Sequence, residues 1–314
     1  MPDPRARGLL LGYLLDLLFG DPRRGHPVAG FGLVAARVEQ RVHADSRAAG
    51  VAYATALVGS TAALGSLADK AVRGHRVLDV ALTAGTTWAV LGGASLAREA
   101  ASVHAHLARG DLPSARKQVT HLVGRDPSGL DPDGVARATV ESLAENTSDA
   151  VVAPLFWGAL AGPAGLLGYR AANTLDAMVG HRSERHLRFG WAAARLDDLL
   201  NLAPARVSAL LAAAAAPLVG GRPADALRAW HRDAPAHPSP NAGPVEAGFA
   251  GALGVVLGGV NVYAGTVEDR GALGHGRRVR PADIPRAVRL ARVVGLGGVI
   301  LAASAASARH RRRR

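Results

Sequence analysis

The stretch that decides the fold is residues 48–68, AAGVAYATALVGSTAALGSLA, which contains no Asp, Glu, Lys or Arg. A helix needs about 17–25 predominantly apolar residues to cross the hydrocarbon core of a bilayer, and this stretch has that length. Arg47 precedes it, and Asp69 and Lys70 follow it, so charge is confined to its two ends. The stretch therefore predicts a membrane-spanning helix.

Further uncharged stretches of the same kind lie along the chain. The clearer ones cover residues 80–97, 150–169 and 247–267, the shorter ones 207–221 and 293–308, and a stretch at 8–20 is interrupted by Asp16. Many are rich in Ala and Gly, so buried helices of a large soluble protein are the alternative interpretation. Small residues also suit close helix packing in membranes, and the separation of charged from apolar segments favours the membrane interpretation.

The overall composition excludes several classes of protein. The 314 residues are 49% hydrophobic and include no cysteine, which excludes a disordered chain, a disulfide scaffold, thiolate zinc sites and iron–sulfur clusters. The net charge is +12, but the mean hydropathy is +0.13 and only 4% of residues are aromatic. This is unlike a basic nucleic-acid-binding domain, so we expect no nucleic-acid partner.

Together these features predict the fold class and the location. We expect an all-α, multi-pass integral membrane protein of the cell membrane, with polar helical loops that carry the active site. Residues 1–308 are expected to form a single membrane-embedded catalytic domain, and residues 309–314 a basic C-terminal tail.

A helix is predicted over residues 133–149, and it carries three carboxylates. Glu141, Glu145 and Asp149 are spaced i, i+4 and i+8, which places them on one face of an α-helix. Such stacked acids repel one another unless a cation or an Arg lies among them, and an all-oxygen cluster suits Mg²⁺. The alternative is a solvated acidic face.

A second polar segment, residues 170–206, alternates acids with Arg. Asn173 and Asp176 are spaced i, i+3, and Asp197 and Asn201 are spaced i, i+4. This pattern is expected where phosphates and a metal ion are held together. The alternative is a salt-bridged polar loop between two membrane helices.

Two loops and one weaker group complete the candidates. The proline-stiffened segment 237–246 presents His237, Asn241 and Glu246, and the turn at 20–28 presents Asp21 and His26; either is also compatible with an ordinary connection. The weaker group is Asn261, Tyr263, Glu268, Asp269 and Arg270. The sequence contains no P-loop, dinucleotide-binding, zinc-protease or serine-hydrolase motif, so a nucleotide would need a non-standard site.

Taken in order, these segments resemble the adenosylcobinamide-phosphate synthases, the CobD/CbiB family of cobalamin biosynthesis. The motifs that carry the resemblance are LDLLFGDP at 15–22, HPV at 26–28, GRD at 124–126, ENTSDAVVAPLF at 145–156, NTLDAMVG at 173–180, FGWAAARLDD at 189–198, HPSPNAG at 237–243 and GGVNVY at 258–263. The resemblance extends from about residue 9 to about residue 270.

The resemblance implies a membrane enzyme that forms an amide. It would join (R)-1-aminopropan-2-ol, or its O-phosphate, to the ring-D propionate carboxylate of adenosylcobyric acid, with ATP as co-substrate and Mg²⁺. Activation of the carboxylate as an acyl phosphate is the ordinary route for such a reaction. The implied partners are the corrinoid, the amine, membrane lipid and other late cobalamin-assembly enzymes.

The expected site residues fall into three groups. Four are expected to hold Mg²⁺: Glu145, Asp149, Asp197 and Asp198. Four are expected to act in catalysis: Asp176, Glu184, Arg195 and His237. Those expected to bind nucleotide or substrate are Asp21, His26, Asn146, Asn173, Arg185, Arg195 and Asn241.

Two other functions compete with this interpretation. A membrane prenyl or phosphatidyl transferase would use the Asp-rich segments as diphosphate clamps without ATP, but paired D-x-x-x-D repeats are absent from the sequence. A non-catalytic transporter subunit predicts charges at mid-membrane and inverted repeats, whereas here most charge lies between the apolar stretches.

Overall fold

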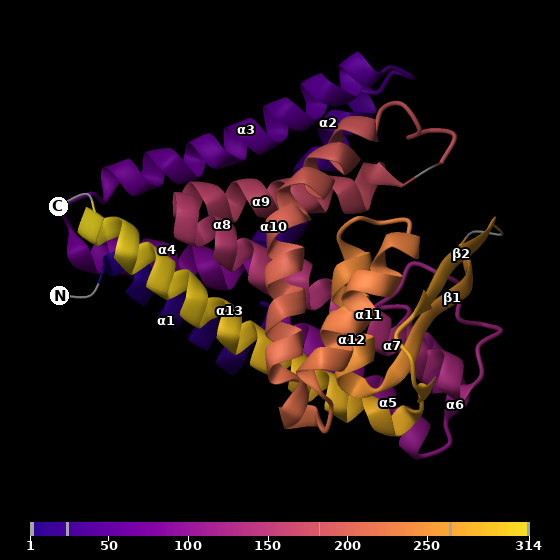
Figure 1. The fold of residues 1–314 in the computed structure, drawn as a ribbon. Coiled ribbons are helices and arrows are strands. Elements are labelled where there is room, and N and C mark those ends of the chain that lie inside the picture. Colours follow the sequence, from indigo (N-terminus) through magenta and orange to yellow (C-terminus); the bar gives the residue numbers. More distant parts are fainter. Residues whose placement is uncertain (1–2, 23–24, 182, 264–265, 313–314) are drawn as a thin grey trace. The chain divides into compact units, whose positions relative to one another are not determined.

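The computed structural model describes residues 3–22, 25–181, 183–263 and 266–312, and most of these residues are helical (Figure 1). The chain divides into two compact units. Unit 1 contains Met1–Gly92, Ala153–Asn201 and Val299–Arg314, and unit 2 contains Gly93–Val152 and Leu202–Gly298. The chain passes from one unit to the other four times. Two of these passages, at residues 201–202 and 298–299, lie inside continuous helices, so no linker in the sequence marks the division.

The regular secondary structure of unit 1 consists of helices alone over its described residues. Its elements are α1 (Pro4–Phe19), α2 (Pro27–Val42), α3 (Arg47–Ala71), α4 (Arg76–Val90), α8 (Ala153–Ala161), α9 (Pro163–Leu175), a π-helical turn (Asp176–Gly180), the first part of α10 (Trp191–Ala215) and the last part of α13 (Ile284–Arg312). Several helices begin as sequence rules predict; for example, Ser46 accepts a hydrogen bond from the Ala48 N–H at the start of α3.

Unit 2 combines helices with a small sheet. Its elements are α5 (Gly93–Ala108), α6 (Leu112–Val119), α7 (Pro132–Thr147), a π-helical turn (Ser148–Val152), the rest of α10, α11 (Pro223–Asp233), α12 (Ala242–Leu253), β1 (Val255–Tyr263), β2 (Thr266–Leu273), β3 (Arg277–Arg278), short 3₁₀ turns at Ala216–Val219, Ala234–Ala236 and Pro281–Asp283, and the first part of α13. The strand order is β2-β1-β3, with β1 antiparallel to β2 and parallel to β3.

Among the described residues, four helical segments are long and apolar enough to cross a membrane. They are Arg47–Ala71, Arg76–Ala108, Trp191–Val219 and Pro281–Arg309. The first two contain the stretches 48–68 and 80–97, where we expected spanning helices. The third contains most of 207–221 and the fourth contains 293–308, which by sequence alone are short stretches.

The predictions at 150–169 and 247–267 are wrong. The first is divided among a π-helical turn, α8 and α9, because Gly162 adopts a left-handed φ of 62° and Pro163 cannot continue the helix before it. The second changes from α12 to β1 at Gly254, and the all-α expectation is corrected by this sheet. Val-rich sequence with glycines at positive φ, such as Gly258, favours a bulged strand over a helix.

The core of unit 2 centres on α12, all of whose residues are buried. It packs against α7, α11 and both long strands. Its sequence, AGPVEAGFAGAL, is made mostly of small residues, so neighbouring backbones approach closely. Glu246 is its single charged residue and is therefore carried into the centre of the unit.

In unit 1, α1 and α4 pack closely because α1 presents glycines toward α4. A Cβ atom added at Gly8 would overlap Thr83, and one added at Gly12 would overlap Thr87. The spacing is the small-xxx-small pattern that lets helix backbones approach in membranes. The outer surface of α1 keeps large apolar side chains exposed, including Leu14 and Leu18.

We predict that Gly12→Ala destabilises the protein by about 1–3 kcal/mol, because the added methyl group forces α1 away from α4. Gly85→Ala is the matched control, since Gly85 lies on α4 with open space around its Cα. It should be neutral or slightly stabilising. Thermal unfolding of both variants in the same detergent checks this, and equal midpoints would contradict the packing.

Candidate active site

Among the described residues of unit 2, two glutamates are buried. Glu141 on α7 is 5% exposed and Glu246 on α12 is 0% exposed. Removing a carboxylate from water costs several kcal/mol unless it is paired and hydrogen-bonded. The partners of these two groups therefore decide what the site can do.

Glu141 is fully partnered. The Arg125 Nη2 donates to its Oε2 at 2.6 Å, the backbone N–H of Gly258 donates to its Oε1 at 2.9 Å, and Arg137 lies 3.7 Å away. Arg137 also donates to the Gly258 carbonyl oxygen. The solvated-face alternative is thereby excluded for Glu141, and the expected Arg among the acids is present.

Glu246 has a different environment. Its Oε1 lies 3.8 Å from His237 Nε2 and 3.9 Å from Arg270 Nη1, and among the described residues neither of its oxygens has a hydrogen-bond partner. Burial and the neighbouring Glu141 and Glu145 raise the pKa of this carboxyl well above its ordinary value. A buried carboxyl group of this kind is well suited to bind a cation or to exchange a proton.

His237 is buried beside Glu246. Its Nδ1 lies 3.1 Å from the Ser239 backbone nitrogen and 3.3 Å from the Ser239 carbonyl oxygen, so Ser239 can serve either tautomer, and Nε2 is the nitrogen nearest Glu246. Burial and the positive charge of Arg270 lower the pKa of His237 to about 4. The imidazole is therefore neutral near pH 7.

Glu145 lies one turn beyond Glu141 on α7. Burial raises its pKa, with Arg270 opposing and Glu141 adding to the rise. Asp149 lies beyond the end of α7, in the π-helical turn Ser148–Val152 that follows it directly. Of the three expected carboxylates, Glu141 and Glu145 therefore belong to α7 itself, and the role of Asp149 stays a prediction.

The two predicted asparagines of unit 2 are both hydrogen-bonded. Asn146 Nδ2 donates to the Ser142 carbonyl oxygen at 3.0 Å, and Asn241 Oδ1 accepts from Arg206 Nη1 at 3.1 Å. Arg206 also contributes to a pocket of about 420 Å³ that shares His237 as a wall residue. The pocket is lined by Arg206, Trp230, His231, Ala234, Pro235, His237, Pro238, Pro240 and Pro244.

The predicted Asp-rich residues of unit 1 form a separate network between α9 and α10. Asp197 accepts hydrogen bonds from Asn173 Nδ2 at 3.3 Å and from Asn201 Nδ2 at 3.0 Å. Tyr169 Oη donates to Asn201 Oδ1 at 2.8 Å. The i, i+4 pairing expected for Asp197 and Asn201 is confirmed.

The remaining predicted residues of unit 1 are less buried. Asp176 begins a π-helical turn, and Asp198 pairs with Arg195 at 3.2 Å. Glu184 and Arg185 are exposed, and Arg185 pairs with Glu39 at 3.1 Å. The Asp21 carboxylate lies 3.7 Å from the His26 ring.

The metal prediction involves residues of both units: Glu145 and Asp149 belong to unit 2, and Asp197 and Asp198 to unit 1. Within the described part of the chain, no group of three or more His, Asp or Glu side chains is placed to hold a metal ion. A bound Mg²⁺ would therefore depend on one or two carboxylates together with phosphate oxygens, which is its usual mode with nucleotides.

Sequence reasoning missed the importance of Arg125, Arg137, Arg270 and Glu246 for the site. Glu246 and Arg270 stand in segments that the sequence marks as polar, but nothing local shows that both approach α7. The side chains of Asn261, Tyr263 and Glu268 lie outside the described residues.

Comparison with known proteins gives a consistent result. The family model described as CobD/Cbib protein matches residues 9–291. A "Cobalamin biosynthesis protein CobD" of Mycobacterium tuberculosis (strain CDC 1551 / Oshkosh) is 53% identical over 298 residues, which is 95% of each chain. Proteins of the same name are 45% identical in Chromobacterium violaceum, over 90% of each chain, and 44% identical in Rhodobacter capsulatus, over 92% of this chain and 96% of that one. No solved structure matches.

We predict that Arg125→Met destabilises the protein by about 3–5 kcal/mol, because it leaves the Glu141 carboxylate buried without its cation. The double variant Arg125→Met with Glu141→Gln should regain most of the loss, since it removes both charges and keeps an oxygen for the Gly258 N–H. Arg222→Met, at an exposed position of unit 2, is the control. Chemical unfolding of the four proteins measures these differences, and a double variant less stable than the single one would contradict the pairing.

Proposed function

The chain belongs to the CobD/Cbib protein family, and on that premise we propose that it is an amide-forming ligase of cobalamin biosynthesis. In this proposal it joins (R)-1-aminopropan-2-ol, or its O-phosphate, to the ring-D propionate carboxylate of adenosylcobyric acid. ATP is the co-substrate, and the enzyme lies in the cell membrane as a multi-pass protein. The curated relatives support a role in cobalamin biosynthesis through their names.

The observation that carries the proposed chemistry is the environment of Glu246. An incoming amine is an ammonium ion at neutral pH and must lose a proton before its nitrogen can attack. A buried carboxylate without hydrogen-bond partners among the described residues binds such a cation and then accepts its proton.

The pKa shifts favour Glu246 over His237 as the base. A general base is most effective when its pKa lies near the working pH. His237, with its pKa lowered to about 4, is a weak proton acceptor, whereas the raised pKa of Glu246 brings it toward neutrality. His237 then serves to position Glu246 or the substrate through Nε2, which lies 3.8 Å from the Glu246 Oε1.

The bonds formed and broken balance in this scheme. Phosphoryl transfer from ATP to the propionate carboxylate yields an acyl phosphate and ADP. The amine nitrogen attacks the acyl carbon, the C–N bond forms, the C–O bond to phosphate breaks, and inorganic phosphate leaves. One proton of the ammonium passes to Glu246, and the second, lost as the C–N bond forms, leaves with the inorganic phosphate. The arginines Arg125 and Arg270 stabilise negative charge near the site.

The residues present fit Mg²⁺ only together with a nucleotide. Three carboxylates, Glu141, Glu145 and Glu246, are offset by three arginines, Arg125, Arg137 and Arg270, so the cluster offers little net charge to a bare divalent ion. Glu145 is the carboxylate we propose to hold the ion in unit 2, with phosphate oxygens completing its shell. Bound Mg²⁺ would neutralise the transferring phosphoryl group.

The pocket beside His237 suits a phosphate group. Arg206 is fixed by hydrogen bonds from its Nη1 to the Leu202 carbonyl oxygen and to Asn241 Oδ1. Fixed guanidinium groups are well suited to bind phosphate. We propose that this pocket takes the phosphate of the amine or of the nucleotide.

Membranes that contain the chain, given adenosylcobyric acid, aminopropanol phosphate, Mg²⁺ and ATP, should form the amide product, detected by mass spectrometry. Product should disappear when ATP is omitted. Unphosphorylated aminopropanol in a parallel reaction identifies the preferred amine. If folded protein gives no product with either amine, the ligase proposal fails, and a lipid diphosphate is then the substrate to test.

Glu246→Gln should reduce kcat by at least about 100-fold, because an amide cannot accept the proton. The isosteric change leaves the packing of α12 intact, so the variant should remain folded. Asp225→Asn, on the surface of unit 2, is the control. Unchanged kcat in Glu246→Gln would exclude Glu246 as the base.

The pH profile tests the same assignment with a defined sign. Activity should rise with pH as Glu246 loses its proton, and the Arg270 charge lowers the pKa of Glu246. Arg270→Gln should therefore shift the rise of kcat/KM to higher pH, while Arg270→Lys, which keeps the charge, should restore it toward the wild-type position. A shift to lower pH in Arg270→Gln would contradict the assignment.

A further inference from the structure

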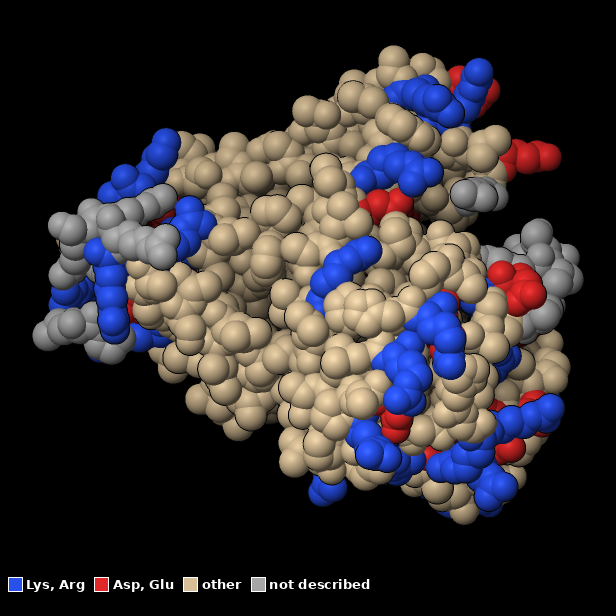
Figure 2. All heavy atoms as spheres, viewed as in Figure 1, with Lys and Arg blue, Asp and Glu red and all other residues tan. Residues whose placement is uncertain are grey.

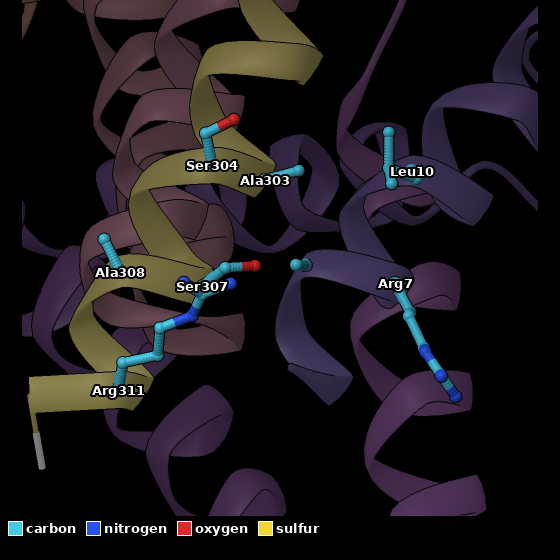
Figure 3. Close-up of a pocket in the computed structure, with 8 residues that line it drawn as sticks. Arg7, Leu10, Ala303, Ser304, Ser307, Ala308 and Arg311 are labelled. Atoms are coloured by element: carbon cyan, nitrogen blue, oxygen red, sulfur yellow. The ribbon is translucent and has the colours of Figure 1, made fainter. Parts of the chain in front are cut away.

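Unit 1 contains a pocket that the proposed chemistry does not use. It has a volume of about 600 Å³ and lies between α1 and the last turns of α13. Its lining residues are Ala6, Arg7, Leu10, Ala303, Ser304, Ser307, Ala308 and Arg311. Figure 3 shows them on the two helices, with Leu10, Ala303 and Ser304 at the upper end. Arg311 lies at the lower end with its guanidinium beside Ser307, and Arg7 lies on α1 with its side chain directed away from α13.

The two arginines of the pocket differ from their neighbours in the chain. Arg5 lies 4.0 Å from the Asp69 carboxylate, and Arg309 donates to the Leu160 carbonyl oxygen at 2.9 Å. Arg7 and Arg311 are exposed, and neither forms an ion pair with an acid of the described residues. Their charge is therefore available to an anion.

The upper end of the pocket continues into an apolar surface. Leu10 and Leu14 on α1 and Ile300 and Leu301 on α13 are large apolar side chains that remain exposed. The left part of Figure 2, which shows unit 1, is uncharged over its middle and carries Lys and Arg at the end near the two termini. Small side chains at Ala303 and Ala308 leave room between the helices.

The position of the pocket along the chain adds an independent argument. The candidate membrane span Pro281–Arg309 ends beside it, and Arg311 lies just beyond that end. The end of a spanning helix lies at the level of the lipid headgroups, where basic side chains attract anionic lipids. A volume of about 600 Å³ is within the usual range for small-molecule pockets.

We propose that this pocket binds an anionic phospholipid, with its phosphate at Arg311 and Ser307 and the first part of an acyl chain along Leu10 and Ala303. The positive charge of Arg7, on the facing helix, adds to the attraction for the anionic headgroup. The Ser307 hydroxyl lies beside Arg311 and provides a hydrogen-bond donor for a phosphate oxygen (Figure 3). The proposal concerns unit 1 alone and does not depend on the ligase activity.

Native mass spectrometry of the full chain in mild detergent tests the proposal. Phosphatidylglycerol and phosphatidylcholine with identical acyl chains are added in turn to delipidated protein. Wild type should retain phosphatidylglycerol in preference, and Arg7→Gln with Arg311→Gln should weaken its binding at least about tenfold. The lysine pair, Arg7→Lys with Arg311→Lys, should keep the preference.

A control pair, Arg41→Gln with Arg222→Gln, removes the same charge at exposed positions elsewhere and should leave binding unchanged. Leu10→Trp should reduce lipid binding by filling the apolar end while both charges remain. Equal binding of the two lipids by wild type, or undiminished binding by Arg7→Gln with Arg311→Gln, would overturn the proposal. Competition by soluble glycerol phosphate at similar concentration would assign the site to free phosphate esters instead.

Discussion

The hydrogen-bonded pairing of Glu141 with Arg125 and the Gly258 N–H is the interaction on which unit 2 depends. The Glu141 carboxylate, which belongs to α7, thereby binds both the loop before that helix, through Arg125, and the bulged strand β1, through Gly258. Because that carboxylate is buried, each partner must be held in place or the group becomes costly. The same pairing holds Glu141 where its charge raises the pKa of Glu246, so the carboxyl group that we propose as the base depends on a structural one.

Burial shifts the pKa values of His237 and Glu246, which lie beside each other at this site, in opposite directions. It favours the neutral form of each, which lowers the pKa of His237 and raises that of Glu246. His237 is therefore a weaker base than an ordinary histidine. The pKa of Glu246, which as an ordinary glutamate would be fully ionised at neutral pH, moves toward neutral pH. The chemistry assigned to each residue follows from its surroundings and differs from what its type suggests.

Buried polar groups need hydrogen-bond or charge partners, and the two units supply these partners in different ways. Unit 1 packs the helices α1 and α4 together through Gly8 and Gly12, and it satisfies the buried Asp197 by hydrogen bonds from the Asn173 and Asn201 amides. Unit 2 carries opposite charges into its core and adds a small sheet. The first pattern suits an apolar environment, and the second suits a site where charged substrates react.

The sequence by itself determined the helical character, two of the candidate spans, the family and the polar segments that contribute to the site. The length of an uncharged stretch and the order of the motifs do not depend on contacts between distant residues, so both can be read from the sequence. The tertiary structure decided which acids matter: Glu246, Arg125 and Arg270 come from segments far apart in the chain, and only folding brings them near Glu141. It also decided that residues 247–263 form the end of a helix and a strand, because glycines at positive φ and strand pairing outweigh the apolar length of this stretch.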